Sequence, residues 1–310
     1  MISSHASSFA GLPVVPFTPG MSLPADPSAV AWRLEVEDFE AEPEEFAALV
    51  AAFREQVPPA AVRAVVIGEW GTAYEQELPV ELLVDAAAEW TGLRAVFLAD
   101  LVSEQCEISW LTLTDITPLL TAYPTLEVLW VRGGNGLTLT PMRHDGLREL
   151  RFESGGLPGA LVRAVGESTL PALERLDVWL GRSDYGGDTT VEDLAPLLAG
   201  AGLPALRHLA VCNGESQDAV VAAVADAAVV PRLAVLDLSM GVLTDQGVDA
   251  LLAGQPLTHL RRLDLHHHFL SEEAQRRVVD ALPGVEVDLS DAQKASVYDG
   301  REYRFTAVGE

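Results

Sequence analysis

Three adjacent histidines, the run His266–His268, suggest metal chemistry because imidazole is the commonest metal ligand in proteins. In an extended segment the outer two share one side and the middle one takes the other. One ion would therefore need a mixed set that adds Asp264, Asp237 and His208 from neighbouring strands. We expect neither a metal site nor a cofactor. We expect the third histidine, His268, to form a hydrogen bond with the backbone of a turn. A metal-dependent enzyme is kept as the least favoured alternative.

Other motifs for catalysis are weak or absent. Cys212 follows His208 by four residues, which places the pair about 13 Å apart along a strand, beyond hydrogen-bond reach. The segment DYGGD at 184–188 lacks the lysine and the spacing of a phosphate-binding loop and is typical of a turn. The nucleophile motif G-x-S-x-G does not occur. The sequence predicts no catalytic residues and therefore no enzyme.

The charge and cysteine content narrow the classes of partner. The 310 residues include 20 basic and 46 acidic ones, for a net charge of −26. Such a chain repels nucleic acid and anionic membranes and attracts basic proteins or peptides, although the acid residues can also serve solubility alone. Two distant cysteines, no export signal and no apolar run of membrane-spanning length favour a cytoplasmic location.

The elements that must position these side chains follow from an internal repeat. The frame L-x-x-L-x-L, with aliphatic substitutes, recurs every 21 to 33 residues and predicts short strands with one face inward. The ten predicted strand segments are 31–36, 62–67, 93–98, 126–131, 147–152, 173–178, 206–211, 233–238, 260–265 and 285–289.

Helical periodicity separates most of these segments. The expected helical segments are 46–53, 80–90, 191–200, 219–230, 247–254 and 274–282. Thr189 with Glu192 has the spacing of a capping box, and Thr244 and Ser271 precede acid residues that suit a helix start. The 21-residue step from Val131 to Phe152 is too short for a helix and is expected to cross as an extended segment.

Strands that alternate with helices in one direction form a parallel sheet with helices on one side. Because helices are wider than the spacing between strands, the stack must curve, with the sheet on the concave side. We expect one α/β solenoid over residues 29–290. Residues 1–28 would form an irregular N-terminal cap, and residues 291–310 a C-terminal cap or a loose tail with a hairpin turn at Asp299-Gly300.

These frames resemble leucine-rich repeats of the ribonuclease-inhibitor-like class, and the segments WLGRSDYGGDTTVEDLAPLL and LDLHHHFLSEEAQRR resemble a small group of bacterial leucine-rich-repeat proteins. The resemblance implies a horseshoe that binds through its concave wall, without enzymatic activity. An accessory subunit that presents a peptide to a modifying enzyme is the alternative it suggests. The slot that usually holds Asn or Cys after the strand mostly holds glycine here, so the usual side-chain ladder is missing.

Residues between the frame leucines should point to the concave face. The central column predicted from this register is Glu35, Val66, Phe97, Trp130, Arg151, Asp177, Ala210, Asp237, Asp264 and Glu286. Aromatic and arginine side chains often anchor interfaces, and acidic columns steer basic partners. The alternative is that the aromatics pack beneath ordered loops and the charges pair across strands. We expect a protein or peptide to contact Phe97, Trp130, Arg132, Arg151, Asp177, Trp179, Asp237, Asp264 and His266.

Overall fold

A computed structural model describes residues 2–310 and contains one long sheet whose strands follow one another in chain order. Every neighbouring pair from β2 to β12 is parallel, and only β1 and β2 are antiparallel. All ten predicted strand segments are confirmed as strands. The strands of the sheet are β1 (Ser8–Phe9), β2 (Leu12–Pro16), β3 (Ala31–Leu34), β4 (Ala64–Ile67), β5 (Ala95–Leu98), β6 (Val128–Arg132), β7 (Glu149–Glu153), β8 (Arg175–Gly181), β9 (His208–Gly214), β10 (Val235–Asp237), β11 (Arg262–Asp264) and β12 (Glu286–Asp288).

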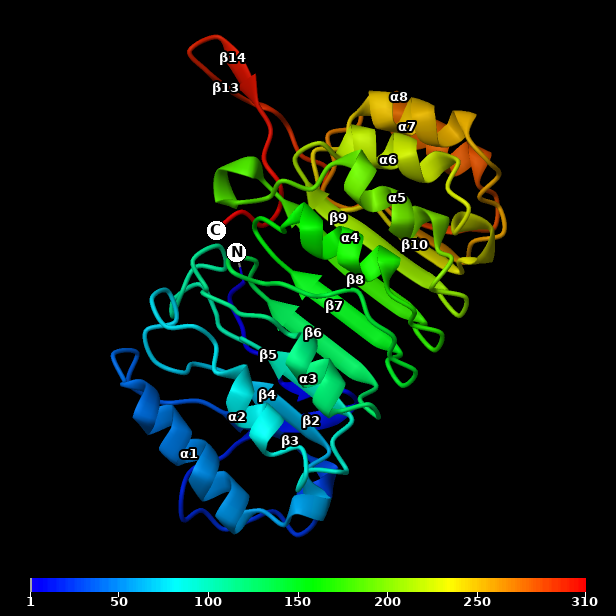
Figure 1. The fold of residues 1–310 in the computed structure, drawn as a ribbon. Helices are drawn as coiled ribbons and strands as arrows, with labels where there is room; N and C mark the ends of the chain where they lie inside the picture. The colour runs from blue at the N-terminus through cyan, green and yellow to red at the C-terminus, as the bar shows by residue number, and fades with distance from the viewer. Residues whose placement is uncertain (1) are drawn as a thin grey trace.

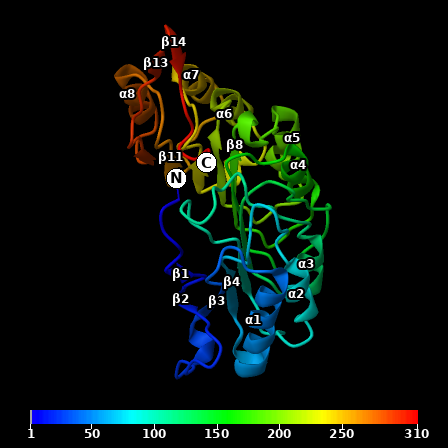
Figure 2. The same ribbon diagram turned by 90° about the vertical axis from the view of Figure 1, so that its left-hand side faces the viewer.

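The helices cover one face of this sheet (Figure 1), and in the side view they occupy the outer side of the curve while the strands line the inner side (Figure 2). The predicted α/β solenoid is therefore confirmed. No helix within residues 2–310 combines the length and the apolar character needed to cross a lipid bilayer. The helices are α1 (Pro43–Gln56), α2 (Val80–Asp85), α3 (Thr117–Ala122), α4 (Gly159–Glu167), α5 (Val191–Ala199), α6 (Gln217–Ala225), α7 (Asp245–Ala253) and α8 (Glu272–Ala281), with short 3₁₀ turns at Pro27–Ala29, Pro59–Ala61, Ser183–Tyr185 and Val230–Arg232.

The helix predictions are correct at most repeats and differ from the structure at four helices. Helix α6 ends at Ala225, five residues before the predicted end at 230. Helix α2 ends at Asp85, five residues before the predicted end. Helices α3 and α4 were not predicted, because α3 is only six residues long and α4 contains two glycines, which are poor helix formers. The connection between β6 and β7 contains no helix, as the short step predicts, and pairs with its neighbours only through isolated bridges such as Asp115 with Thr138.

The caps show how single side chains set helix starts. Thr244 and Ser271 act as predicted, since their hydroxyls accept hydrogen bonds from the backbone N–H of Gln246 and Ala274. The box predicted for Thr189 and Glu192 is wrong by one residue. The N-cap of α5 is Thr190, which exchanges hydrogen bonds with Asp193. The same spacing fits both positions, so only the backbone turn decides between them.

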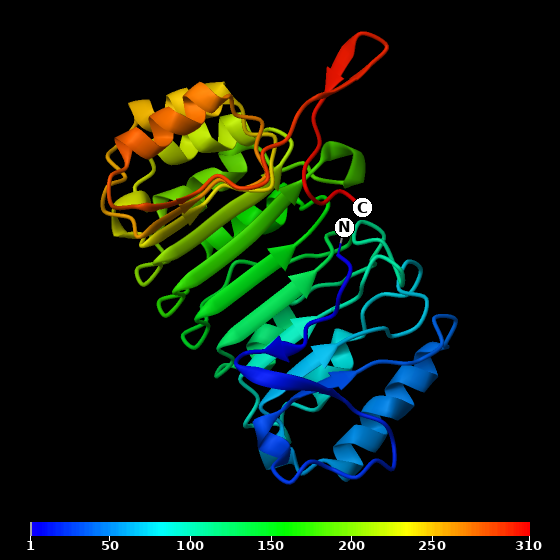
Figure 3. The same cartoon turned by 180° about the vertical axis from the view of Figure 1, so that it is seen from behind.

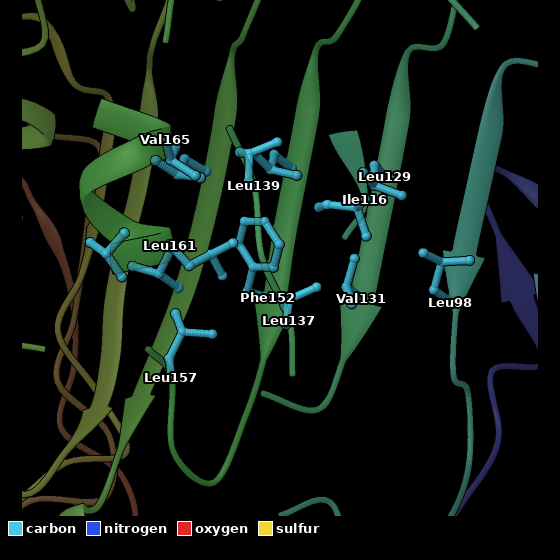
Figure 4. Packing of buried hydrophobic residues seen from close by; sticks show 14 of the residues in the cluster. Leu98, Ile116, Leu129, Val131, Leu137, Leu139, Phe152, Leu157, Leu161 and Val165 are labelled. Atoms are coloured by element: carbon cyan, nitrogen blue, oxygen red, sulfur yellow. The ribbon is translucent and has the colours of Figure 1, made fainter. Parts of the chain in front are cut away.

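The frame aliphatics form one continuous core between sheet and helices. Figure 4 shows the middle of this core, with Leu129 and Val131 of β6 and Phe152 of β7 on the sheet side and Leu161 and Val165 of α4 on the helix side. All five side chains are buried. Because each repeat contacts mainly its neighbours, the stack holds the strands side by side and fixes the positions of the residues that point to the inner face.

The two ends of the chain are more ordered than the sequence suggests. The predicted irregular N-terminal cap contains β1 and β2, which form a hairpin, and β2 joins the sheet beside β3. The turn predicted at Asp299-Gly300 is confirmed, and it joins β13 (Ser296–Tyr298) to β14 (Arg301–Tyr303). The N-terminal segment runs over the inner face of the sheet, and both termini lie near each other (Figure 3).

Candidate functional site

The register confirms the predicted central column of the inner face from Val66 to Asp264. It corrects both ends of that column. Arg33, not Glu35, lies beside Val66, and Asp288, not Glu286, lies beside Asp264. The weak frame copies in the first and last strands were each aligned two residues away from the true pairing. A shift of two keeps a side chain on the same face, so the face was predicted correctly and the neighbours were not.

The N-terminal half of the inner face is covered by the chain itself. Phe9 of β1 lies with its ring centroid 5.8 Å from that of Phe97 and 5.2 Å from that of Trp130. Only 1% of Phe97 is exposed, while Trp130 remains half-buried. A partner cannot reach Phe97 while Phe9 occupies this position. The alternative, that the aromatics pack beneath an ordered segment, therefore describes Phe97.

A buried ion cluster lies next to the aromatic residues and is centred on Asp100. Its carboxylate accepts hydrogen bonds from Arg33 Nη1 at 2.5 Å, Arg132 Nη1 at 2.9 Å and the backbone N–H of Ala6 at 3.0 Å. Arg132 also pairs with Glu153. Because Asp100 has no exposed surface and Arg132 is buried, this cluster holds the N-terminal segment in place and offers no free arginine. Arg132 thus pairs within the chain.

Asp177 is the centre of a second charge cluster. Arg151 lies over the ring of Trp130 at 4.2 Å and pairs with Asp177 at 2.9 Å, and Arg175 pairs with the same carboxylate at 2.7 Å. His208 Nε2 is 3.2 Å from the other oxygen of Asp177. Burial alone would raise the pKa of Asp177, but His208 and the two guanidinium groups together hold it well below the usual range. Asp177 is buried and already paired.

Beyond Asp177 the wall is open and its charge is less balanced. Asp237 accepts hydrogen bonds from Cys212 Sγ at 3.2 Å and from the backbone N–H of Ser239 at 3.0 Å. Within residues 2–310 no Lys, Arg or His pairs with Asp237, which makes it the unpaired carboxylate of the central column. Its neighbour in the column toward β8 is Ala210, which is buried, whereas Asp237 itself is partly exposed.

The last part of the wall carries a hydrogen-bonded set around Asp264. Its carboxylate accepts from His266 Nδ1 at 2.8 Å and from Arg262 Nη2 at 2.8 Å, and the same guanidinium also pairs with Asp288. Burial would raise the pKa of Asp264, but the hydrogen bonds from His266 and Arg262 lower it to about 2. The bond to Asp264 in turn raises the pKa of His266.

The other histidines and the cysteines behave as structural residues. His268 accepts from the backbone N–H of Leu270 and contacts the carbonyl of Leu289, which confirms its predicted role in turn backbone. In the part of the chain that the structure describes, no three His, Cys, Asp or Glu side chains come together as a metal site. Burial raises the pKa of Cys106 to about 11 and that of the fully buried Cys212 well above its usual value.

Asp188 of the DYGGD segment accepts a hydrogen bond from the backbone N–H of Gly159, and Gly186 there has a φ of +85°. The segment is a turn, as its composition predicts. It also contacts the start of α4, which the sequence did not predict.

The predicted contact residues divide into two groups. Trp130, Arg151, Trp179, Asp237 and His266 are partly exposed on the inner face. Phe97, Arg132, Asp177 and Asp264 are buried. Sequence reasoning missed Phe9, Arg33 and Asp100, which occupy or organise the covered half. Asp100 follows a strand, where an acidic residue of an ordinary turn is also common. Its partners Arg33 and Arg132 lie 67 and 32 residues away in the sequence, so no local pattern identifies Asp100 as the centre of a cluster.

No protein-family model matches the chain, and no curated protein does. Among solved structures, the chain is similar to a protein from Bacteroides fragilis determined by the Northeast Structural Genomics Consortium. The two chains are 28% identical with a TM-score of 0.76, and the match covers 88% of this chain and 77% of the other. This likeness supports the repeat-solenoid architecture.

Proposed function

We propose that the chain is a non-catalytic leucine-rich-repeat binding protein that captures a basic peptide or a basic protein segment on the open part of its inner face. The open part is defined here as the exposed surface of β8–β12, and Asp237 lies at its centre. What supports the assignment to leucine-rich repeats is the frame L-x-x-L-x-L, whose aliphatic positions are buried at successive strands. Glycine in the usual Asn slot makes the repeats atypical.

The single observation that carries the binding proposal is the unpaired carboxylate of Asp237. The neighbouring acids Asp177 and Asp264 are each held by basic groups of the chain, whereas Asp237 has hydrogen bonds only from Cys212 and Ser239. A guanidinium or ammonium group placed against the exposed side of Asp237 would give this carboxylate its missing counter-ion. Such a charge-assisted bond is stronger than a neutral one.

The chain's own N-terminal segment supports peptide capture by this kind of surface. It packs one aromatic ring, Phe9, against both Phe97 and Trp130, and it donates the Ala6 backbone N–H to Asp100. An external peptide on β8–β12 would make the same two kinds of contact. One of its side chains would pack against Trp179, and one of its positive charges would pair with Asp237. The raised thiol pKa values of both cysteines support a role without covalent catalysis.

A peptide-binding experiment tests this proposal. Fluorescent octapeptides that carry two arginines, two citrullines or two glutamates at the same positions would be titrated with the chain, and anisotropy would report the dissociation constant. The arginine peptide should bind most tightly. Asp237→Asn should weaken it by about tenfold or more, since a charge pair is lost.

Asp280→Asn is the matched control, because Asp280 is exposed on α8 and belongs to the helix side. It removes the same charge and should leave the dissociation constant unchanged. Equal binding of the three peptides, or equal effects of the two substitutions, would refute the proposal.

A further inference from the structure

The hairpin β13–β14 projects away from the rest of the molecule (Figures 1 and 3). Val297 and Tyr298 are 70% and 77% exposed, and the hairpin forms a two-stranded sheet of its own. Its two ends are fixed. A bridge joins Ala292 to His268 before it, and after it Val308 exchanges two hydrogen bonds with the buried side chain of Asn213. An isolated two-stranded hairpin with open sides is marginally stable in water.

We propose that this hairpin is a dimerisation element, in which β13 pairs edge to edge with β13 of a second copy of the chain. The four strands would form one small antiparallel sheet around a two-fold axis. Such an arrangement is closed, because each copy uses the same edge. This proposal concerns a surface far from the inner face and does not depend on the proposed peptide binding.

The register of the hairpin identifies which backbone groups are free. The turn Asp299-Gly300 has φ values of +50° and +71°, which is the geometry of a two-residue type I′ turn. Tyr298 and Arg301 flank this turn as a hydrogen-bonded pair, so the next pair, Val297 with Glu302, directs its N–H and C=O groups outward. Each outer edge of the hairpin therefore presents unpaired backbone groups, a template for another strand.

The side chains distinguish the two edges. Antiparallel pairing of two β14 strands about their outward residue would place Glu302 opposite Glu302 of the second copy, and like charges directly opposite are destabilising. Pairing of two β13 strands would place Val297 opposite Val297 and Ser296 opposite Tyr298. These pairs are uncharged, and β-branched and aromatic residues suit a sheet. The β13 edge is therefore the self-complementary one.

The charge distribution makes the hairpin the place where two copies of this acidic chain can approach with the least repulsion. The segment from Lys294 to Arg304 holds three basic and two acidic residues, whereas the whole chain has a net charge of −26. The hairpin therefore carries a formal charge of only +1, so two hairpins repel each other far less than two acidic bodies do. Because the hairpin projects outward, the two acidic bodies can stay apart while the hairpins pair.

Light scattering during size-exclusion chromatography tests the association. The proposal predicts a mass that rises with concentration from 33.2 kDa toward twice that value. Val297→Pro removes the outward N–H of β13, and by symmetry the dimer loses two hydrogen bonds. The dimer should then dissociate about 30-fold more readily.

Glu302→Pro is the matched control, because it removes the outward N–H of the other edge and carries the same risk to the hairpin itself. It should leave dimer formation intact. A monomer at every concentration, or equal loss of the dimer in both variants, would overturn the proposal.

A second measurement uses the fact that Lys294 is the only lysine of the sequence. In the proposed pairing the two copies of Lys294 lie about 20 Å apart along the strands, at ~3.4 Å per residue. A bis-amine-reactive crosslinker should therefore join Lys294 to Lys294, which mass spectrometry of peptides would identify. Lys294→Arg keeps the charge and should abolish this product. Its absence in the wild-type dimer would show that another surface holds the copies together.

Discussion

At the scale of single residues, the inner face is organised by carboxylates that differ in their partners rather than in their type. Asp100 and Asp177 are buried beneath arginines, and Asp264 is held by Arg262 and His266. Asp237 alone among the column acids has no basic partner in the described chain. The chain therefore neutralises most of its inner-face charge internally and leaves Asp237, the position that we propose for a partner, without a counter-ion.

Asp264 should make stability depend on pH in the acid range. Its pKa in the folded chain is lowered to about 2 from 3.8, so its stabilising contribution is present above pH 3.8 and is lost as the pH falls toward 2. The shift corresponds to about 2 kcal/mol. Urea unfolding should show Asp264→Asn less stable than wild type by about this amount at pH 6, with the difference shrinking at pH 3 and below. A difference independent of pH would contradict the assigned interactions.

At the scale of elements, the N-terminal hairpin and the strands beneath it form a second, smaller apolar cluster on the inner face. Phe9 contacts Phe97 and Trp130, and Val66 lies in the same cluster. Residues 2–9 of this hairpin are held by one buried ring, by pairing of β1 with β2, and by a few hydrogen bonds to Asp100 and Ser103. This segment is thus expected to detach before the solenoid unfolds.

Phe9→Ala should release this segment locally. Loss of a buried phenylalanine costs about 3–5 kcal/mol, so the backbone N–H groups of Ala6 and Val14 should exchange with solvent at least about 100-fold faster. Hydrogen exchange followed by mass spectrometry would measure this, with strands β8–β11 as internal reference. Phe39→Ala is the control, since Phe39 is 52% exposed. Unchanged exchange in Phe9→Ala would mean that the ring does not hold the segment.

The pattern of apolar residues predicted the secondary structure well wherever that pattern depends on which side chains are buried. The leucine frame located every strand between Ala31 and Asp288, because alternation along a strand directly reflects which face is inside. Helix α4 was missed because Gly159 and Gly166 fit closely against α5, a tertiary reason that propensity cannot express. Cover over Phe97 was considered only as an alternative, and Phe9 was not identified as that cover, because the two residues are 88 positions apart.

At the scale of the whole molecule, the parallel stack creates a long wall, and its two halves differ. The half near β3–β6 is closed by residues 2–9, and the half near β8–β12 is open and acidic. The terminal hairpin projects from the open half's end of the molecule (Figure 1). We propose that a partner binds to the open half and that a second copy is contacted elsewhere, at the terminal hairpin.

The location of a bound basic peptide tests this account most directly. A lysine-containing peptide would be incubated with the chain and a carbodiimide, which joins an amine to a carboxylate in direct contact, and the modified residue would be identified by mass spectrometry. The account predicts coupling to Asp237. Coupling spread over the acids of α1 and α8, with Asp237 unmodified, would contradict it.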